Sequence, residues 1–383
     1  MDLTVKGKKG RIKVAFIANT SWYLYNFRLP LITEFLSRDL EVVVIAPKDK
    51  WSEILKQLGI RFINVGINRK GQNIVEDIKL TNTLIKIYRK EHPDYIFHFT
   101  IKPVVFGTIA SIFINNIKVI NNITGLGYVF IGSSIKHQIL QPIVRLLYRF
   151  SLRYSYRLVF QNGDDKNYFL KYGLFNDDNK MIIVPGSGIV ISNSKDIREK
   201  KDNNICKFIF VGRMLKDKGV IEYFLAAKEI KKRYNNVEFI IIGDFDLNNP
   251  EFISTAEVEK WCQNGIVKYC GWIEDVESQL KDSDVFVLPS YREGMPRSTL
   301  EALAASLPII TTNVPGCRET VVHGKNGLLV PMKNVHKLVE AIEYMLNNPE
   351  ERLWMGKESR KLAVERFDVK RVNRIFLDAI GIK

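Results

Sequence analysis

Two glutamates, Glu293 and Glu301, lie eight residues apart in a segment whose residue types suit a sugar phosphate. The preceding run, Asp284–Leu288, has the β-branched, apolar character of a short buried strand, and a helix is predicted from about Leu300. Backbone N–H groups are unpaired where a helix begins and attract phosphate, whereas carboxylates bind sugar hydroxyls. The two carboxylates could also act as general acid and base. A polar loop without a ligand explains the spacing alone equally well.

A second loop, Gly212–Gly219, places two cations near the start of the next predicted helix. Arg213 and Lys218 would bind a diphosphate together with the N-terminus of that helix. The alternative is a solvated basic loop. Both loops follow strands of the same predicted sheet, and ligands of such sheets bind beyond the carboxyl ends of the strands. Two phosphate-suited loops and two carboxylates at one edge therefore predict a nucleotide-sugar site.

Two successive series of alternating strands and helices must position these residues. The first series opens with the apolar strand Ile12–Ala18 and a predicted loop, 19–28, that leads to a helix from about Leu29. The second series opens at Lys207–Val211, after a polar run, 192–204, with the composition of a linker. This alternation predicts an α/β fold with two mostly parallel, doubly wound sheets.

Composition is that of a folded protein with more than one core. The chain has 383 residues, 46% of them apolar and 26% charged, which favours two domains of ordinary size. Its four cysteines show no CxxC or Cys/His ligand spacing, so we expect reduced thiols in a cytosolic protein. No apolar run approaches the roughly 20 residues of a membrane-spanning helix, and the basic N-terminus has no signal-sequence pattern.

Positive charge is concentrated in the first half of the chain. Residues 1–200 carry 30 Lys and Arg against 16 Asp and Glu, and no acidic residue lies between Asp94 and Asp164. Such a surface suits nucleic acid, an anionic membrane or a phosphorylated substrate. A nucleic-acid-binding protein is the alternative from a different class. The sequence argues against it, because we find no recognisable nucleic-acid module or aromatic–glycine signature.

Several motifs, taken in order, resemble the retaining GT-B glycosyltransferases of family 4. The second half supplies Glu293-x7-Glu301, Gly212-Arg213 with Lys218, and the runs 312–319 and 322–330. Motifs of the first half resemble the subgroup that assembles bacterial glycans on undecaprenyl diphosphate, which includes N-acetylgalactosaminyltransferases. These motifs are Tyr25–Arg28, Thr100–Pro103, Asn122–Gly127 and Pro185–Gly188.

The resemblance implies two Rossmann-like domains that face each other across a cleft. Residues 1–195 would form the N-terminal acceptor-binding domain and 196–365 the C-terminal nucleotide-sugar-binding domain. The last segment, 366–383, would form a helix that packs back on the N-terminal domain.

The resemblance also implies donor-binding roles. Arg213 and Lys218 would neutralise the diphosphate, Glu301 would bind the ribose, and Glu293 would contact the donor sugar. Further nucleotide-sugar contacts are expected from Gly243, Gly294, Met295, Pro296, Ser298 and Thr299. The family needs no metal, so we expect neither a metal nor another cofactor.

Catalytic and acceptor residues are expected in the first half as well. His98 ends a predicted strand and is a candidate catalytic residue beside Glu293, Arg213 and Lys218, the alternative being a core histidine. Many relatives carry a Gly-Gly pair after the first strand, but here Asn19 and Thr20 stand there. Candidates on the acceptor or phosphate side are Asn19, Arg28, Lys102, Thr124, Gly125 and Gly127.

A basic stripe predicts contact with an anionic membrane. Arg145, Arg149, Arg153 and Arg157 recur every four residues along a predicted helix. A solvated basic face over a core helix is the alternative. A membrane contact would suit an acceptor that is itself lipid-linked.

The resemblance implies transfer of a hexosamine, N-acetylgalactosamine or N-acetylglucosamine, from a UDP-sugar to an undecaprenyl-diphosphate-linked sugar, with retention. The alternative acceptor is a lipopolysaccharide core or a capsule glycan. We expect a cytoplasmic enzyme associated peripherally with the inner face of the cell membrane.

Overall fold

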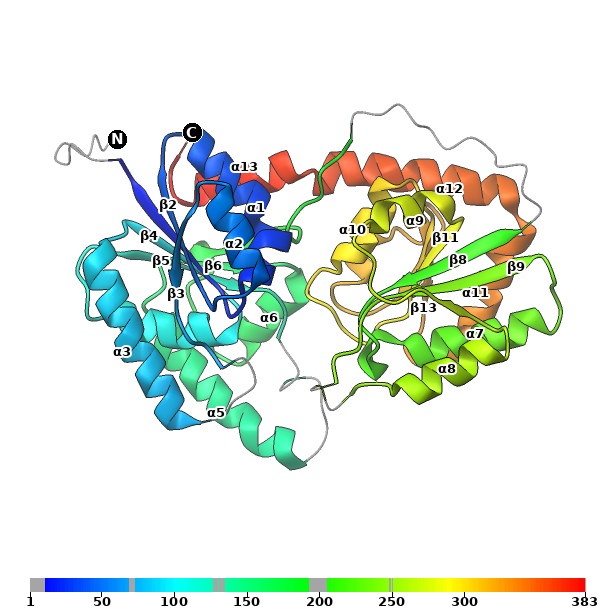
Figure 1. Cartoon of the computed structure of the whole chain (residues 1–383), viewed down its shortest axis with the longest axis horizontal. Helices are drawn as coiled ribbons and strands as arrows, with labels where there is room; N and C mark the ends of the chain where they lie inside the picture. The colour runs from blue at the N-terminus through cyan, green and yellow to red at the C-terminus, as the bar shows by residue number, and fades with distance from the viewer. Residues whose placement is uncertain are drawn as a thin grey trace. The chain divides into compact units, whose positions relative to one another are not determined.

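A computed structural model describes residues 11–68, 73–126, 130, 135–192, 205–247, 249 and 251–382 (Figure 1). The chain forms two compact units, Met1–Val184 with Asn373–Lys383, and Pro185–Val372. The second unit begins ahead of the expected boundary at 195/196. The reason is that Ile189 donates its N–H to Phe367 O and accepts from Val369 N, which ties this strand-like segment to the second unit.

The described strands of unit 1 form a seven-stranded sheet in the order β3-β2-β1-β4-β5-β6-β7, with every neighbouring pair parallel. Most of these strands are continuous apolar runs, because helices cover both faces of a parallel sheet. The strands are β1 (Lys13–Ile17), β2 (Glu41–Ala46), β3 (Arg61–Asn64), β4 (Tyr95–Phe99), β5 (Lys118–Ile123), β6 (Arg157–Phe160) and β7 (Met181–Ile183).

The connections of unit 1 are helical. They are α1 (Ser21–Ser37), α2 (Lys50–Gln57), α3 (Ile74–Glu91), a π-helical turn (Pro103–Gly107) followed by α4 (Thr108–Ser111), α5 (Ile135–Leu152) and α6 (Gly163–Lys171). The π-helical turn contacts both α3 and α5. Side-chain oxygens cap α1, α2, α3 and α6 at their N-termini, which satisfies otherwise unpaired backbone N–H groups.

Helix α1 begins earlier than the sequence predicts. Thr20 adopts an extended conformation, and its hydroxyl accepts from Tyr23 N, so the helix starts at Ser21. Pro30 lies inside the helix rather than at its first turn. The expected loop, 19–28, is therefore mostly helical, because the Thr20 cap outweighs the preference of proline for a helix start.

Unit 2 repeats the pattern with a six-stranded parallel sheet in the order β10-β9-β8-β11-β12-β13. Its strands are β8 (Cys206–Val211), β9 (Val237–Ile242), β10 (Lys268–Tyr269), β11 (Val285–Leu288), β12 (Ile309–Thr312) and β13 (Gly327–Val330). Its helices are α7 (Val220–Lys231), α8 (Thr255–Gln263), α9 (Val276–Asp282), α10 (Arg297–Ala304), α11 (Val335–Asn347) and α12 (Pro349–Leu362).

The last helix, α13 (Val369–Ala379), starts in unit 2 and packs on unit 1 from Asn373 onward (Figure 1). The ring of Phe376 meets that of Phe97 at 6.0 Å, and Asn373 donates to Pro30 O. The fold class predicted from the sequence, two doubly wound parallel-sheet domains with a returning C-terminal helix, is confirmed. Within the described residues, no helix has the length and apolar character needed to cross a membrane.

Candidate functional site

The centre of the candidate site in unit 2 is an ion pair between Lys218 and Glu293. Lys218 Nζ lies 2.5 Å from Glu293 Oε1, and the two side chains are 17% and 12% exposed. Ser290 Oγ donates to the same carboxylate oxygen at 2.9 Å. The Lys218 side chain follows β8 and that of Glu293 follows β11, neighbouring strands whose carboxyl ends share one edge. The structure thus brings these two predicted residues together.

Backbone contacts hold the two loops against each other. Asp217 O accepts from Tyr291 N at 2.8 Å and from Ser290 Oγ at 3.0 Å. Gly219, with a φ of +73°, lies so close that a Cβ would be 2.0 Å from Pro289 O. Only glycine fits there, since any side chain would collide with backbone. The Lys218–Glu293 geometry is therefore set by the fold of both loops.

Arg213 lies at the exit of β8 but pairs with a different carboxylate. Its Nη1 is 2.9 Å from Asp246 Oδ2, and its side chain is 45% exposed. Gly243 has a φ of +153°, and a Cβ there would lie 1.8 Å from Gly212 O. The predicted ligand contact Gly243 therefore serves first to let the β8 and β9 exits pack closely. Arg213 places an exposed cation beside them.

Glu301 is held within its own helix. Arg297 Nε donates to Glu301 Oε1 at 2.8 Å, one turn apart on α10. Both side chains are partly exposed, at 26% and 29%, so a ligand could reach either of them. Among the described residues, no hydrogen bond or ion pair joins Glu301 to Glu293.

The segment before α10 leads into a helix that no side chain caps. Pro296 occupies the N-cap position. Gly294 and Pro296 are buried, Ser298 is half-buried, and Met295 packs against Gly186. Thr299 is fully buried, and its Oγ1 has no hydrogen-bond partner among the described residues. An uncapped N-terminus with these neighbours suits an anionic group.

The sequence reasoning missed a second layer beneath the ion pair. Tyr291 OH donates to Glu222 Oε1 at 2.6 Å, and the buried environment raises the pKa of Tyr291. Burial also raises the pKa of the Asp217 carboxyl, while the Lys218 ammonium opposes that rise. No local pattern of the sequence indicated that Asp217, between two lysines, would have a buried carboxylate oxygen.

The turn at Pro315 and Gly316 fixes the position of Glu293. In the sequence this turn was identified only as part of the family motif 312–319. The Glu293 N–H donates to Pro315 O at 3.0 Å, and a Cβ on Gly316 would lie 2.3 Å from Glu293 O. Cys317 follows in this turn, and burial raises the pKa of its thiol to about 12. This thiol is therefore protonated at neutral pH and serves packing rather than nucleophilic chemistry.

His98 is a core residue of unit 1. It is fully buried, with Nε2 2.9 Å from Tyr88 OH and Nδ1 2.9 Å from Asn121 Oδ1. Burial lowers its pKa to about 4, against a smaller opposing effect of Asn121. Its ring fills the space left by Gly107, where a Cβ would lie 2.5 Å from Nε2. The structure therefore contradicts a catalytic role for His98 and supports the core alternative.

Arg28 and Lys102 are also held inside unit 1. Arg28 is 2% exposed, and its guanidinium lies 4.5 Å from the centre of the Phe99 ring and donates to Tyr23 OH. Lys102 Nζ forms a half-buried ion pair with Asp77 at 2.6 Å. Burial contradicts direct contact of Arg28 with an acceptor. The early start of α1 explains it, because a helical Arg28 points into aromatic rings.

The remaining acceptor-side candidates are near the carboxyl end of β4 and β5. Asn19 donates its N–H to Thr100 Oγ1 at 3.3 Å and is partly exposed. Thr124 and Gly125 are partly exposed, and Gly125 has a φ of +131°. Gly127 lies outside the described residues.

Most of the predicted basic stripe is bound internally. Arg145 donates to Tyr168 OH and lies 4.0 Å from the centre of the Tyr172 ring. Arg149 donates to the carbonyls of residues 172 and 173, and Arg157 to Asn179 O. Arg153 is exposed and contacts its neighbour Tyr154. The four arginines do not form a uniform free surface on one helix. Only Arg145 and Arg149 lie on α5, whereas Arg157 begins β6, and these three side chains bind partners between residues 168 and 179.

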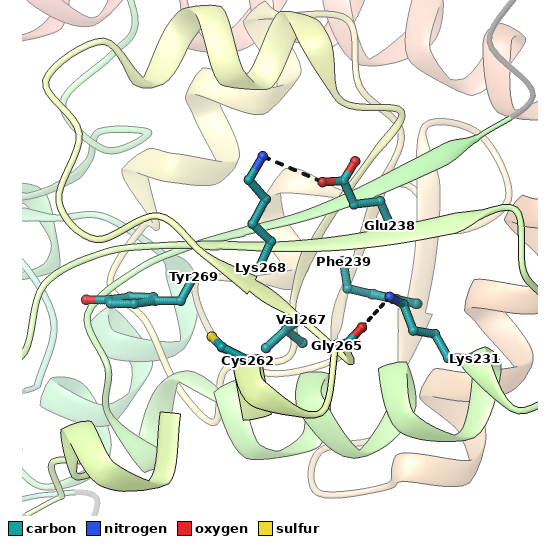
Figure 2. Close-up of a pocket in the computed structure, with 8 residues that line it drawn as sticks. All are labelled: Lys231, Glu238, Phe239, Cys262, Gly265, Val267, Lys268 and Tyr269. Carbon is teal, nitrogen blue, oxygen red and sulfur yellow. Dashed lines mark hydrogen bonds and ion pairs between the residues drawn. The ribbon is translucent and has the colours of Figure 1, made fainter. Parts of the chain in front are cut away.

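A surface pocket of about 390 Å³ lies elsewhere in unit 2, at the edge strand β10 (Figure 2). Lys231 donates to Gly265 O across it, and Lys268 faces Glu238 at 3.8 Å. None of the candidate donor-binding residues lines this pocket. Its lining residues are Lys231, Glu238, Phe239, Cys262, Gly265, Val267, Lys268 and Tyr269.

Two family models match the chain in succession. Residues 13–162 match the family described as glycosyl transferase 4-like, and 192–362 match glycosyl transferases group 1. Together they span most of both units. The chain belongs to the group 1, GT4-like glycosyltransferases. The Lys218–Glu293 site lies in the group 1 part.

Curated relatives span nearly the full length. The chain is 28% identical over 365 residues to the N,N'-diacetylbacillosaminyl-diphospho-undecaprenol alpha-1,3-N-acetylgalactosaminyltransferase of Campylobacter jejuni, covering 92% of this chain and 94% of that protein. It is also 28% identical to the UDP-Gal:alpha-D-GlcNAc-diphosphoundecaprenol alpha-1,3-galactosyltransferase of Escherichia coli, covering 79% of each.

Solved structures establish the fold. Anabaena HepE, crystallised with UDP, matches with a TM-score of 0.76 at 18% identity, covering 97% of this chain and 100% of that one. Sucrose-phosphate synthase from Thermosynechococcus elongatus matches with a TM-score of 0.78 at 16% identity, covering 97% and 98%. The fold of this glycosyltransferase is GT-B.

Proposed function

We propose that the chain transfers a hexosamine, N-acetylgalactosamine or N-acetylglucosamine, from a UDP-sugar to an undecaprenyl-diphosphate-linked sugar, with retention of configuration. The observation that carries the proposal is the half-buried Lys218–Glu293 pair at the carboxyl edge of β8 and β11. It places a cation and a carboxylate side by side, as binding of a sugar joined to a diphosphate requires. The Campylobacter and Escherichia relatives support the lipid-linked acceptor.

The cations would do the main chemical work. When the bond between the sugar and the diphosphate breaks, negative charge grows on the departing phosphate oxygen. Lys218 and Arg213 would stabilise that charge, which is the largest contribution expected of the protein. A ligand can reach both cations from solvent, because the Lys218 side chain is 17% exposed and that of Arg213 is 45% exposed. Donor phosphate can therefore replace the carboxylates that bind them in the free protein.

Glu293 would then face the donor sugar. Ser290 Oγ and the turn at Pro315 keep its position when Lys218 turns to phosphate. A carboxylate so placed accepts hydrogen bonds from sugar hydroxyls and opposes the positive charge that develops on the sugar ring. The uncapped N-terminus of α10 would bind phosphate, and Glu301 the ribose. We propose no metal or other cofactor for this reaction, because two cationic side chains supply the charge.

The acceptor and the place of reaction follow from the same chemistry. A polyprenyl-linked acceptor is confined to a bilayer, so we propose peripheral association with the anionic inner face of the cell membrane. Unit 1, the basic half, would bind the acceptor. The alternative acceptor, a lipopolysaccharide core or a capsule glycan, uses the same donor site and is favoured by the likeness to the capsular polysaccharide glycosyltransferase CapM of Staphylococcus aureus, at 26% identity over 346 residues.

The proposal is tested by incubating the purified protein with UDP-N-acetylhexosamines and a sugar linked to polyprenyl diphosphate. We expect a product heavier by one N-acetylhexosamine in mass spectrometry, with and without a chelator. Elongation of lipopolysaccharide core or capsule fragments alone would favour the alternative acceptor. Absence of transfer from any nucleotide sugar, with no thermal stabilisation by UDP, would contradict the proposal.

A further inference from the structure

The outward face of α5 carries a row of exposed apolar side chains. Ile143, Leu146, Phe150 and Tyr154 are 51%, 65%, 43% and 42% exposed. Their spacing of three, four and four residues puts them on one side of the helix and of the turn that ends it. Single exposed apolar residues are ordinary, but a continuous row marks a contact surface.

Packing fixes the direction of this row. Val144, Tyr148 and Leu152 lie on the other side of α5 and belong to the core of unit 1. Tyr148 is 3% exposed and packs against core rings, including that of Phe169 with ring centres 5.3 Å apart. The helix cannot turn its apolar row inward without pulling these side chains into water. The row is therefore a permanent feature of the folded surface.

Charge around the row identifies its partner. Arg149 and Arg153 are exposed beside it, and the sequence holds no Asp or Glu from 95 to 163. The Arg153 guanidinium stacks on the rings of Phe150 and Tyr154, at 4.6 and 4.8 Å from their centres. Aliphatic and aromatic residues bordered by arginine, in a stretch of sequence without Asp or Glu, are typical of a helix that lies in the headgroup layer of an anionic bilayer.

We propose that α5 is a membrane-docking helix whose apolar row, Ile143, Leu146 and Phe150, inserts among the lipids of an anionic bilayer. Arg153 binds headgroup phosphates, and Tyr154 lies at the interface. The apolar row, not the arginine periodicity, carries the contact, because Arg145, Arg149 and Arg157 are bound internally. The proposal deepens the proposed function and rests on it, since a lipid-linked acceptor is reached only at a membrane.

The first test is co-sedimentation of the full chain with vesicles of phosphatidylcholine, with and without phosphatidylglycerol. We expect the double variant Leu146→Ser/Phe150→Ser to lose at least about tenfold in partitioning onto anionic vesicles. Arg153→Gln should lose about fivefold on anionic vesicles and little on neutral ones. Leu58→Ser is the matched control, because Leu58 is 53% exposed in the same unit at the end of α2. It should bind like the unchanged chain.

A second readout reports insertion directly. In Phe150→Trp, lipids with brominated acyl chains should quench the added tryptophan beyond the signal of the five native ones. No added quenching, or unchanged vesicle binding of the double variant, would overturn the proposal. So would self-association of the chain that the double variant abolishes while vesicle binding persists, because the row would then join two copies.

Activity separates this inference from the proposed function. With a short-chain, water-soluble acceptor, the double variant should match the unchanged chain, and with the acceptor in vesicles it should be at least about tenfold slower. If the unchanged chain transfers sugar and the variant shows no vesicle-specific loss, the docking helix is refuted alone. If the unchanged chain transfers no sugar to either acceptor, the proposed function fails while vesicle binding still reports on α5.

Discussion

The substitution Glu293→Gln tests most directly whether Glu293 contacts the donor sugar while Lys218 and Arg213 bind the diphosphate. It keeps the shape of the side chain and removes its charge. In the free protein Glu293 accepts from Lys218 at 2.5 Å and from Ser290 at 2.9 Å. Hydrogen bonds to a charged partner contribute roughly 1.5–3 kcal/mol, so we expect the free energy of unfolding to fall by about 2 kcal/mol.

The same change should have opposite effects on nucleotide binding and turnover. Without the carboxylate, Lys218 has no competitor for donor phosphate, so the Kd of UDP should stay the same or fall up to about tenfold. Transfer should slow at least about 100-fold, because a preorganised charge opposite the developing positive centre is lost. Titration calorimetry with UDP and steady-state release of UDP measure the two quantities.

Ser290→Ala is the matched control, because it removes one hydrogen bond to Glu293 and keeps the charge. We expect its turnover to fall by no more than about fivefold. A Kd for UDP that rises more than about tenfold in Glu293→Gln would refute the reasoning, since Glu293 would then bind the nucleotide rather than the sugar. Undiminished turnover would refute it equally.

Three other expectations follow from the packing. Gly243→Ala should lower the free energy of unfolding by at least about 3 kcal/mol in denaturant titrations, because its Cβ would meet Gly212 O at 1.8 Å. Gly271→Ala, at positive φ but with nothing within 4 Å, should cost only about 1 kcal/mol; equal losses would contradict this. His98→Gln should keep turnover within about threefold, whereas a general acid–base role would require a loss of about 100-fold or more. Because burial lowers the pKa of His98 from 6.5 to about 4, the unfolded chain binds more protons between these values. Stability should therefore fall by roughly 3 kcal/mol as the pH drops from 6.5 to 4, and His98→Gln should abolish that slope.

The sequence predicted those parts of the site that depend on local residue patterns, namely two strands and the charged residues of the loops that follow them. Apolar runs identified β8 and β11, and cations or carboxylates directly after strands identified Lys218 and Glu293. Parallel sheets place such loops at one edge, so the sequence predicted that both residues lie at the same edge of the sheet, but not that they form an ion pair. The packing of Gly219 against Pro289 was beyond reach, because it depends on how closely two backbones approach.

The predictions failed where tertiary packing, rather than local sequence, determines the surroundings of a side chain. His98 ends a strand as predicted, but the missing side chain of Gly107 opens a core position for its ring. Arg28 was expected in a loop, and the Thr20 cap instead put it on a helix facing aromatic rings. Arginines at every fourth residue from 145 to 157 indicated a shared helix face, yet Arg145 donates a hydrogen bond to Tyr168 OH. Periodicity alone cannot show which long side chains find partners.

The central claim is sugar transfer from a UDP-sugar with retention onto a lipid-linked acceptor. It is tested most directly by the anomeric configuration of the product formed from UDP-N-acetylgalactosamine or UDP-N-acetylglucosamine and a sugar linked to polyprenyl diphosphate. Proton NMR of the new glycosidic linkage should show the α configuration, the same as in the donor. A β linkage, or no linkage from either donor, would contradict the account.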